Sequence, residues 1–225
     1  MGNVGTAPGT TVLTLPGGQT IALADWIDDK QWTTVELTTG DNESLQAFAT
    51  GRSQQIVGGA RLNTAVDTNI QGTGLQGLQK AWEFMVYGWA MEYIRATRAP
   101  STLAGFSDPV SLRTAFELDR RIFCEYYYNG KQYTQGLIRD YPAGAGLTLF
   151  TTNPTTELVQ NGVPSPRDRV ALVLPVRERE LNAYFFNITP VTALVIAQPA
   201  TDGGANLDTV DVRIKKNGLI KRTVV

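Results

Sequence analysis

Residues 122–141 read IFCEYYYNGKQYTQGLIRDY, in which apolar and polar residues alternate on both sides of Asn129-Gly130. Asn-Gly is the strongest short-range signal for a two-residue hairpin, because both turn positions need a positive φ. The period of two and the many Tyr, Phe and Ile residues are typical of strands with one buried face. The stretch therefore predicts an antiparallel β-hairpin and points to a mainly β fold.

The chain on the C-terminal side continues this β pattern. Short apolar runs separated by Pro or polar residues predict strands at 147–152, 170–176, 181–188 and 191–198. A loop punctuated by Pro is expected over 153–168. A second Asn-Gly, at Asn217-Gly218, separates LDTVDVRIKK from LIKRTVV. By the same reasoning it predicts a second hairpin, carrying basic residues, near the end of the chain.

The chain on the N-terminal side is less regular. Residues 32–39 alternate like a strand, weaker strand candidates lie at 44–50 and 54–57, and DWIDD (25–29) could cap a short turn. Residues 63–79 are rich in Gly, Asn and Gln and predict a long loop. The first 24 residues are rich in Gly, Thr and Pro and predict an extended arm, or a small hairpin that turns at Pro16-Gly17-Gly18.

Two segments bear on the helix content. Residues 81–99 (AWEFMVYGWAMEYIRATRA) fit both helical and strand spacing, but their aromatic residues and Gly88 favour a long strand buried on both faces. Asp108-Pro109 is a helix start, with Asp108 as N-cap, and predicts a helix over about 109–121. With one short helix and many strands, the chain is expected to be an antiparallel β-sandwich, with an arm over 1–24 and a single domain over 25–225.

The composition argues against most kinds of catalytic site. The 225 residues include no His and a single Cys, so Ser-His-Asp and Cys-His arrangements, His-containing zinc sites and intrachain disulfides are all excluded. Cys124 lies in an apolar, aromatic run, which favours a buried inert thiol. The net charge of −1 excludes the strongly basic balance of a dedicated nucleic-acid binder. We expect no enzyme, cofactor, metal or small-molecule substrate.

Three motifs resemble functional sites and are interpreted otherwise. Residues 72–77 match G-x-G-x-x-G, but the strand before and the helix after that a dinucleotide site needs are missing, so a flexible loop is expected. Glu178 and Glu180 alternate with Arg177 and Arg179, which indicates a solvated turn or strand edge. Residues 202–208 space oxygen ligands like a calcium loop but lack its later Glu, which favours a polar turn.

Two groups of residues are candidate contact surfaces. Tyr126, Tyr128 and Tyr133 could stack on sugars or bases, although cross-strand packing is the more common role of such residues on a sheet. The C-terminal basic patch could meet nucleic acid, lipid headgroups or an acidic neighbour, or could protect a sheet edge from unwanted pairing, and both interpretations stay open. Its members are Arg213, Lys215, Lys216, Lys221 and Arg222.

Residues 170–198 (VALVLPVRERELNAYFFNITPVTALVIAQ) resemble the paired strands of viral jelly-roll coat proteins. A Pro-ended strand passes there through a short charged turn into a strand that alternates aromatic and polar residues. The loop containing Asp67-Thr68-Asn69 ahead of a long aromatic strand is similar to capsid proteins of tailless icosahedral viruses and bacteriophages. The resemblance covers about residues 60–225. The first 24 residues resemble coat proteins only in their general character, as an arm of the kind that coat proteins lay over neighbouring subunits.

The resemblance implies a single jelly roll with an arm and insertions, acting as a virion structural protein. Such a subunit would be made in the host cytoplasm, since neither a signal peptide nor a spanning helix is expected, and would end in the virion. Its partners would be copies of itself and other virion proteins, with lipid headgroups or the genome at the C-terminal basic hairpin. The alternative is a carbohydrate- or receptor-binding β-sandwich module of a spike or tail, using the tyrosines and the 153–168 loop.

Overall fold

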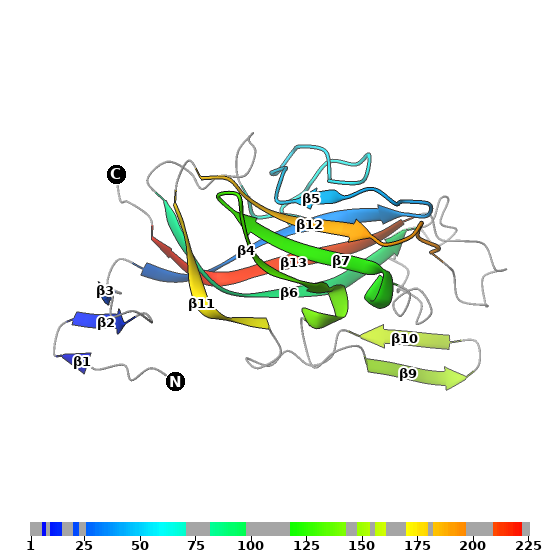
Figure 1. Ribbon diagram of the computed structural model, residues 1–225. Helices are drawn as coiled ribbons and strands as arrows, with labels where there is room; N and C mark the ends of the chain where they lie inside the picture. The colour runs from blue at the N-terminus through cyan, green and yellow to red at the C-terminus, as the bar shows by residue number, and fades with distance from the viewer. Residues whose placement is uncertain are drawn as a thin grey trace.

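The computed structural model is a mainly β molecule in which two antiparallel sheets are stacked (Figure 1). The structure describes residues 6–7, 10–14, 20–22, 26–70, 82–97, 118–142, 148–153, 156–160, 170–179, 182–196 and 209–221. The expected antiparallel β-sandwich is confirmed. No helix among these residues is long and apolar enough to cross a membrane.

Each main sheet has four strands. The first has the order β11-β6-β13-β4 and the second the order β5-β12-β7-β8. The strands of the first sheet are β11 (Val170–Arg179), β6 (Glu83–Thr97), β13 (Thr209–Lys221) and β4 (Trp26–Thr38). The strands of the second are β5 (Leu45–Ala47), β12 (Tyr184–Pro190), β7 (Ile122–Tyr128) and β8 (Lys131–Leu137).

The strand pairs of the sandwich are nested along the chain. In chain order, the first strand, β4, pairs with the last, β13, and the second, β5, pairs with the next to last, β12. The third, β6, pairs with β11, and the fourth, β7, pairs with β8. The first half of the sandwich therefore runs antiparallel to the second half along its whole length. Two further pairs, β13 with β6 and β12 with β7, close the two sheets.

The core lies between the sheets and is aromatic at its centre. Trp89 of β6 reaches across to Tyr126 of β7, with ring centroids 4.7 Å apart, and to Phe186 of β12, at 4.8 Å. Strands β7 and β12 alternate strictly between buried and half-buried residues, as strands with one face on a core do. Cys124 is fully buried within this core.

Two predictions from the sequence are confirmed. Asn129 and Gly130 join β7 to β8 with φ values of 49° and 76°, the positive angles that a two-residue hairpin turn needs. The segment that fitted both helix and strand is the long strand β6. Residues 84–86 and 88–91 of this strand are buried, which agrees with the expected burial on both faces.

The predicted hairpin at Asn217-Gly218 is wrong, because β13 runs through both residues without turning. The register between β13 and β6 shifts at this point, so the dipeptide forms a β-bulge in a central strand. A Cβ atom on Gly218 would lie 2.0 Å from the backbone oxygen of Met85. Glycine is needed here for close approach of two backbones, not for a turn.

Other element predictions also need correction. DWIDD (25–29) caps no turn, because residues 26–29 belong to β4. Residues 191–196 are not a strand, and the supposed loop 153–168 contains β10 (Thr156–Gln160), which pairs with β9 (Thr148–Asn153). Strand β8 ends earlier than expected, because a 3₁₀ turn (η2, Ile138–Asp140) follows Leu137.

Several predictions fall partly or wholly outside the described residues. Residues 118–121 are helical, as expected, whereas 109–117 lie outside. Residues 63–70 form no strand, in agreement with the predicted loop, and 71–79, with the G-x-G-x-x-G match, lie outside. The polar turn at 202–208 and Arg222 also lie outside.

The first 24 residues contribute a small sheet of their own. Strand β2 (Thr10–Thr14) pairs with β1 (Thr6–Ala7) on one side and with β3 (Thr20–Ala22) on the other. Thr14 is the partner of Thr20, which corresponds to the small hairpin that the sequence allowed as an alternative to an extended arm.

Candidate functional site

The most unusual chemical feature of the sandwich is an ion pair in its interior. Lys216 of β13 and Glu178 of β11 both have fully buried side chains, and Lys216 Nζ lies 2.5 Å from Glu178 Oε2. Residues 210, 212 and 214 of β13 are buried apolar residues, and Lys216 follows them in the period of two on the same face. The backbone therefore directs this lysine into the core.

Aromatic rings surround the ammonium group of Lys216. Its Nζ lies 3.5 Å from the ring centroid of Tyr184, 4.6 Å from that of Phe84 and 5.6 Å from that of Phe48. The faces of aromatic rings attract cations, more strongly where water is absent. The rings offer no hydrogen-bond acceptor on their faces comparable to a carboxylate, so Glu178 is the main polar partner of Lys216.

The second oxygen of Glu178 is also occupied. The Tyr126 hydroxyl donates a hydrogen bond of 2.6 Å to Glu178 Oε1. Because Tyr126 belongs to β7 of the other sheet, this bond joins the two layers. The neighbouring Tyr128 hydroxyl accepts hydrogen bonds from the backbone N–H of Arg179 and from the side chain of Asn182, both at 2.9 Å. The two tyrosines thus fasten the end of β11 to the opposite sheet.

Burial shifts both members of the ion pair toward their neutral forms. Desolvation raises the pKa of Glu178, although the nearby Lys216 ammonium opposes this rise. Desolvation lowers the pKa of Lys216 to about 8 against the attraction of Glu178. Burial next to Glu178 also raises the pKa values of the Tyr126 and Tyr184 hydroxyls, so both stay protonated donors.

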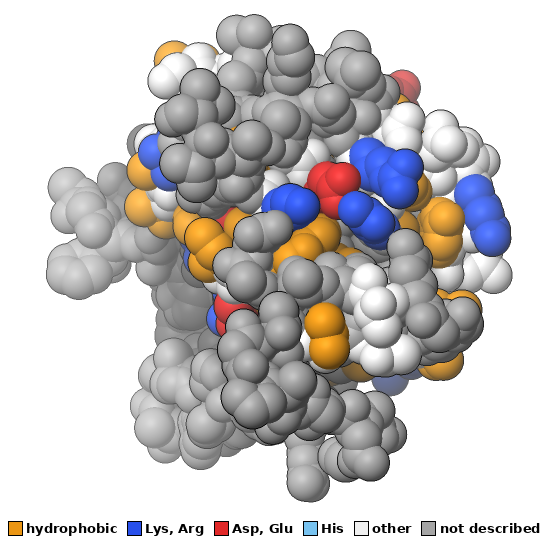
Figure 2. Space-filling model, turned by 90° about the vertical axis from the view of Figure 1, so that its left-hand side faces the viewer, with side chains coloured by type: hydrophobic (Ala, Val, Ile, Leu, Met, Phe, Trp, Pro, Cys, Tyr) orange, Lys and Arg blue, Asp and Glu red, His pale blue; other side chains and the backbone are white. Residues whose placement is uncertain are grey.

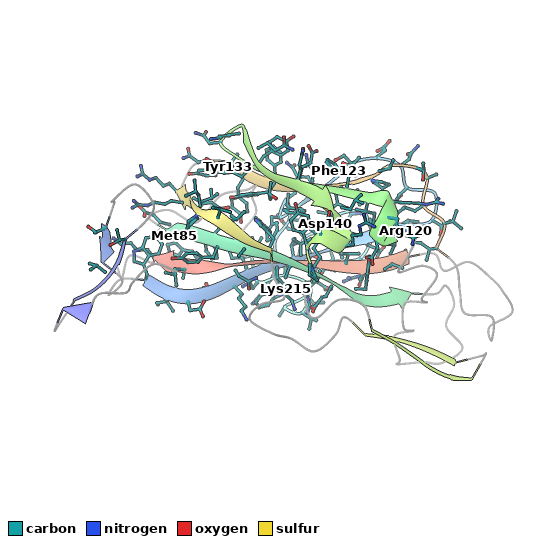
Figure 3. All side chains as sticks on the ribbon, turned by 60° about the horizontal axis from the view of Figure 1, so that its bottom comes forward. Met85, Arg120, Phe123, Tyr133, Asp140 and Lys215 are labelled. Carbon is teal, nitrogen blue, oxygen red and sulfur yellow. The ribbon has the colours of Figure 1, made fainter. Side chains whose placement is uncertain are left out.

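The structure separates the residues of the expected aromatic patch. Tyr126 is fully buried and Tyr128 nearly so, whereas Tyr133 of β8 is exposed (Figure 3). Tyr133 packs against the other two with tilted rings, at centroid distances of 6.0 Å from Tyr126 and 6.4 Å from Tyr128. The possible stacking surface is therefore excluded for Tyr126 and Tyr128, because their rings fill the core, in agreement with the cross-strand packing that the sequence favoured.

The structure also divides the expected basic patch. Lys216 is in the core, so its place in a contact surface is wrong: β13 runs straight through Asn217-Gly218, and alternate residues face opposite sides. Arg213 and Lys215 lie on the outer face of the sheet, where both pair with Glu92 of β6, at 3.1 and 2.6 Å (Figure 3). Lys221 ends β13 at the opposite end of the strand from Thr209.

The interpretation of Glu178 and Glu180 as solvated is wrong for Glu178. Residues 177–179 end β11, where alternate side chains face inward and outward, and Glu178 faces inward with Lys216 as its counter-ion, whereas Glu180 lies outside the described residues. Arg177, on the other face, forms an ion pair with Glu83 at the start of β6. Figure 2 looks onto this end of the sandwich, where Lys and Arg side chains gather around Asp or Glu side chains.

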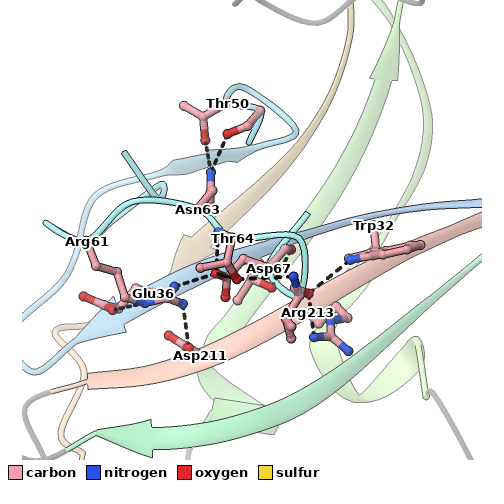
Figure 4. A network of polar contacts seen from close by, with 12 residues as sticks. Trp32, Glu36, Thr50, Arg61, Asn63, Thr64, Asp67, Asp211 and Arg213 are labelled. Carbon is pink, nitrogen blue, oxygen red and sulfur yellow. Dashed lines mark hydrogen bonds and ion pairs between the residues drawn. The ribbon is translucent and has the colours of Figure 1, made fainter. Parts of the chain in front are cut away.

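A second charged cluster lies on the outer face of the first sheet (Figure 4). Arg61, from the loop between β5 and β6, reaches Asp67 and Asp211, each at 2.8 Å, and Glu36 at 3.4 Å. The cluster holds this loop against β4 and β13. Burial alone would raise the pKa of Asp67, but hydrogen bonds from Arg61 and Thr64 outweigh it and lower that pKa to about 2.

The outer face of the second sheet combines aromatic and polar groups. The rings of Tyr127 (β7) and Phe185 (β12) are stacked, with centroids 5.1 Å apart. Beside them Glu125 Oε1 accepts hydrogen bonds from the Tyr127 hydroxyl at 3.0 Å and from Gln132 at 2.8 Å. These side chains face away from the core, so a ligand could reach them.

The edge strand β11 carries exposed apolar side chains. Residues 172–175 are not paired with β6, because the register shifts between Ala171 and Val176. Within this bulge Val173 is 93% exposed and Leu174 is 60% exposed. An edge strand with uncovered apolar residues is a site where another protein can bind.

Comparison with known proteins gives no relative. No family model matches the chain, and neither a curated protein nor a solved structure is similar to it. Within the described part of the chain, no group of three or more Cys, Asp or Glu residues could hold a metal ion.

The sequence contains a signal for the burial of Lys216. Val210, Val212, Ile214 and Lys216 alternate with polar residues, which places Lys216 on the apolar face. The supposed hairpin at Asn217-Gly218 led us to interpret the basic residues as an exposed group. The partner Glu178 could not be identified, because β11 and β13 are separated in the sheet by β6.

Proposed function

We propose that this chain is a virion structural protein, a capsid-type subunit whose function is to assemble with copies of itself and with other virion proteins. The observation that carries the proposal is the nested pairing of β4 with β13, β5 with β12, β6 with β11 and β7 with β8. This is the path of an antiparallel hairpin rolled into two sheets, which supports a jelly-roll topology. Jelly rolls with eight strands are common in viral capsid and lectin domains.

The edge at β11 supports assembly as the mode of action. Val173 and Leu174 expose apolar surface at the edge of a sheet, which a subunit that stays alone would be expected to cover or replace by charged residues. Pro175 and the bulge hinder the addition of a further strand there. Contact through side chains with a neighbouring copy is therefore the favoured use of this edge.

The basic residues of β13 give less support to binding of the genome or of lipid headgroups. Arg213 and Lys215 share Glu92 as a counter-ion, and Lys216 is buried. Neutralised cations release few counter-ions on binding a phosphate backbone, so their contribution to affinity is small. The proposal therefore places the contacts between subunits first.

The proposal is tested by the size of what the purified protein forms. Light scattering at rising concentration and negative-stain images are expected to show a regular oligomer or particle. Val173→Lys should weaken assembly, because it puts a charge into the apolar contact, while the thermal unfolding transition stays unchanged. Val191→Lys, at a residue that is 65% exposed outside β11, is the matched control. A wild-type chain that is monomeric at every concentration contradicts the proposal.

The arm gives a second test of assembly. Deletion of residues 1–24 should weaken assembly while leaving the unfolding transition of the sandwich largely intact, since arms rich in Gly and Thr gain order from a neighbouring subunit. Assembly equal to that of the full chain would remove the arm from the proposed contacts.

A second candidate, a carbohydrate-binding module, is favoured by the outer face of the second sheet. Tyr127 and Phe185 offer ring surface there, with the hydrogen-bonding groups of Glu125 and Gln132 beside it. Saccharides bind where apolar ring faces lie beside such polar groups. A glycan array with Tyr127→Ala and Phe185→Ala tests this role, with Tyr133→Ala as control. Binding that is absent, or that survives both changes, rejects it.

A further inference from the structure

The buried pair of Lys216 and Glu178 is positioned for a reaction as well as for an ionic contact. An amine and a carboxyl group 2.5 Å apart, both fully buried, can neither exchange partners nor be solvated by water. Two reacting groups held in this way react as if at very high concentration, because the entropy of bringing them together is already lost.

We propose that Lys216 and Glu178 form an intramolecular amide, an isopeptide cross-link between β13 and β11 that the folded chain makes by itself. The inference goes beyond the proposed function, and neither depends on the other. The cross-link would join two strands that lie on either side of β6, through residues that are 38 positions apart in the chain.

The reaction needs no oxidant, cofactor or external base. The proton of the Lys216 ammonium passes to Glu178 Oε2 along the bond between them, which leaves a neutral amine and a neutral carboxylic acid. The amine nitrogen attacks Cδ of Glu178, forming the C–N bond and a tetrahedral intermediate with negative charge on Oε1. The nitrogen then passes a second proton to Oε2, the bond from Cδ to Oε2 breaks, and one water molecule leaves.

The surroundings of the pair favour each of these steps. Burial lowers the pKa of Lys216 and raises that of Glu178, so the neutral, reactive forms are more populated than in water. The Tyr126 hydroxyl, 2.6 Å from Oε1, donates to the oxygen on which negative charge develops. The rings of Tyr184, Phe84 and Phe48 keep the ammonium end of the pair away from water, which would hydrolyse the product.

The amide product is expected to be more stable in the core than the ion pair from which it forms. A buried ion pair bears the desolvation cost of two charges, which its mutual attraction often fails to offset. A neutral amide removes both charges and retains one N–H donor and one C=O acceptor. The Tyr126 hydroxyl stays placed to donate to that C=O, since Oε1 becomes the amide oxygen.

Intact-mass measurement of the full-length protein under denaturing conditions tests the proposal. The mass is expected to be lower than that of the sequence by one water molecule, and proteolysis should give a branched peptide joining residues 178 and 216. A chain with the full mass of its sequence, after prolonged incubation in the folded state, overturns the proposal.

Variants locate the reaction. Lys216→Arg and Glu178→Ala should each restore the full sequence mass, because a guanidinium is a poor nucleophile and alanine has no carboxyl group. Lys215→Arg, at the adjacent residue on the outer face, should keep the loss of one water. Loss of water that persists in Lys216→Arg would place the dehydration elsewhere and overturn the proposal.

Tyr126→Phe should slow the appearance of the cross-linked form in a time course, and an unchanged rate would remove Tyr126 from the mechanism.

Discussion

Two charged clusters lie on opposite faces of β13, and they are built on different principles. On the inner face one cation, Lys216, meets one carboxylate, Glu178, with both fully buried. On the outer face Arg61, with 28% of its side chain exposed, is shared by three carboxylates. The inner pair has no substitute if one member is lost, whereas the outer cluster has several contacts and access to water. On one face of β13 the loss of a single side chain therefore removes the whole ionic contact. On the other face it removes only part of the contact.

Removal of Glu178 should have the largest effect of any single change in these clusters. Relative to the chain that still carries the ion pair, before the proposed cross-link forms, Glu178→Ala leaves the Lys216 ammonium buried without a carboxylate. We expect a loss of about 3–5 kcal/mol in the free energy of unfolding. Urea denaturation measures it. The double variant Lys216→Met, Glu178→Leu is the control, since it removes both charges and should be more stable than Glu178→Ala. A loss below about 1 kcal/mol in Glu178→Ala would show that water reaches this site.

Removal of Arg61 should have a smaller and graded effect. Arg61→Ala leaves three carboxylates close together, and we expect a loss of about 1–2 kcal/mol, partly recovered at high salt because salt screens their mutual repulsion. Arg179→Ala, at an exposed position, is the control and should be near neutral. The comparison of the two clusters fails if the loss in Arg61→Ala equals that in Glu178→Ala and does not respond to salt.

The outer cluster should also make stability depend on acid. The pKa of Asp67 is lowered in the folded state from 3.8 to about 2. The stabilisation is therefore fully present above pH 3.8 and is lost as the pH falls toward 2, where the folded carboxylate takes up its proton. Thermal unfolding followed across this range should show a steeper decline for the wild-type chain than for Asp67→Asn. Equal slopes would contradict the assigned role of Asp67.

The smallest loss of stability is expected at Lys215, and its neighbour Lys216 allows the two faces of β13 to be compared directly. Lys215→Ala should cost less than about 1 kcal/mol, because its bond to Glu92 is partly exposed and Arg213 also pairs with Glu92. Lys216→Ala, one residue further, should cost several times more, because it leaves Glu178 buried without its cation. Similar losses at 215 and 216, measured by the same urea titration, would mean that the two faces of β13 do not differ in dielectric environment.

Local sequence rules predicted the fold class but were unable to separate two identical dipeptides. Asn129-Gly130 and Asn217-Gly218 carry the same signal, yet the first is a turn with positive φ and the second a bulge in a central strand. The difference lies in the neighbours: Gly218 approaches the backbone of Met85, which is remote in the sequence. A hairpin requires only local interactions, whereas a bulge depends on the strand opposite.

The candidate site was less predictable than the fold for a related reason. The alternation in 210–216 was sufficient to place Lys216 on the buried face. Its partner depends on the phase of β11 after its bulge, which decides whether Glu178 or its neighbours Arg177 and Arg179 face inward. The role of the tyrosines was open for a similar reason. Periodicity says that Tyr126 and Tyr128 share a face opposite to Tyr127, but it does not say which face is covered.

The nested pairing has a consequence for how the molecule forms. Strand β13 is the last in the chain order of the sandwich, yet it lies between β6 and β4 and bonds to both along its whole length. Until residues 209–221 leave the ribosome, the inner edges of β4 and β6 have no partner. Folding must therefore wait for the final strand, and topologies that depend on such distant contacts fold slowly and expose aggregation-prone edges. The nascent chain should depend on chaperones until β13 is inserted.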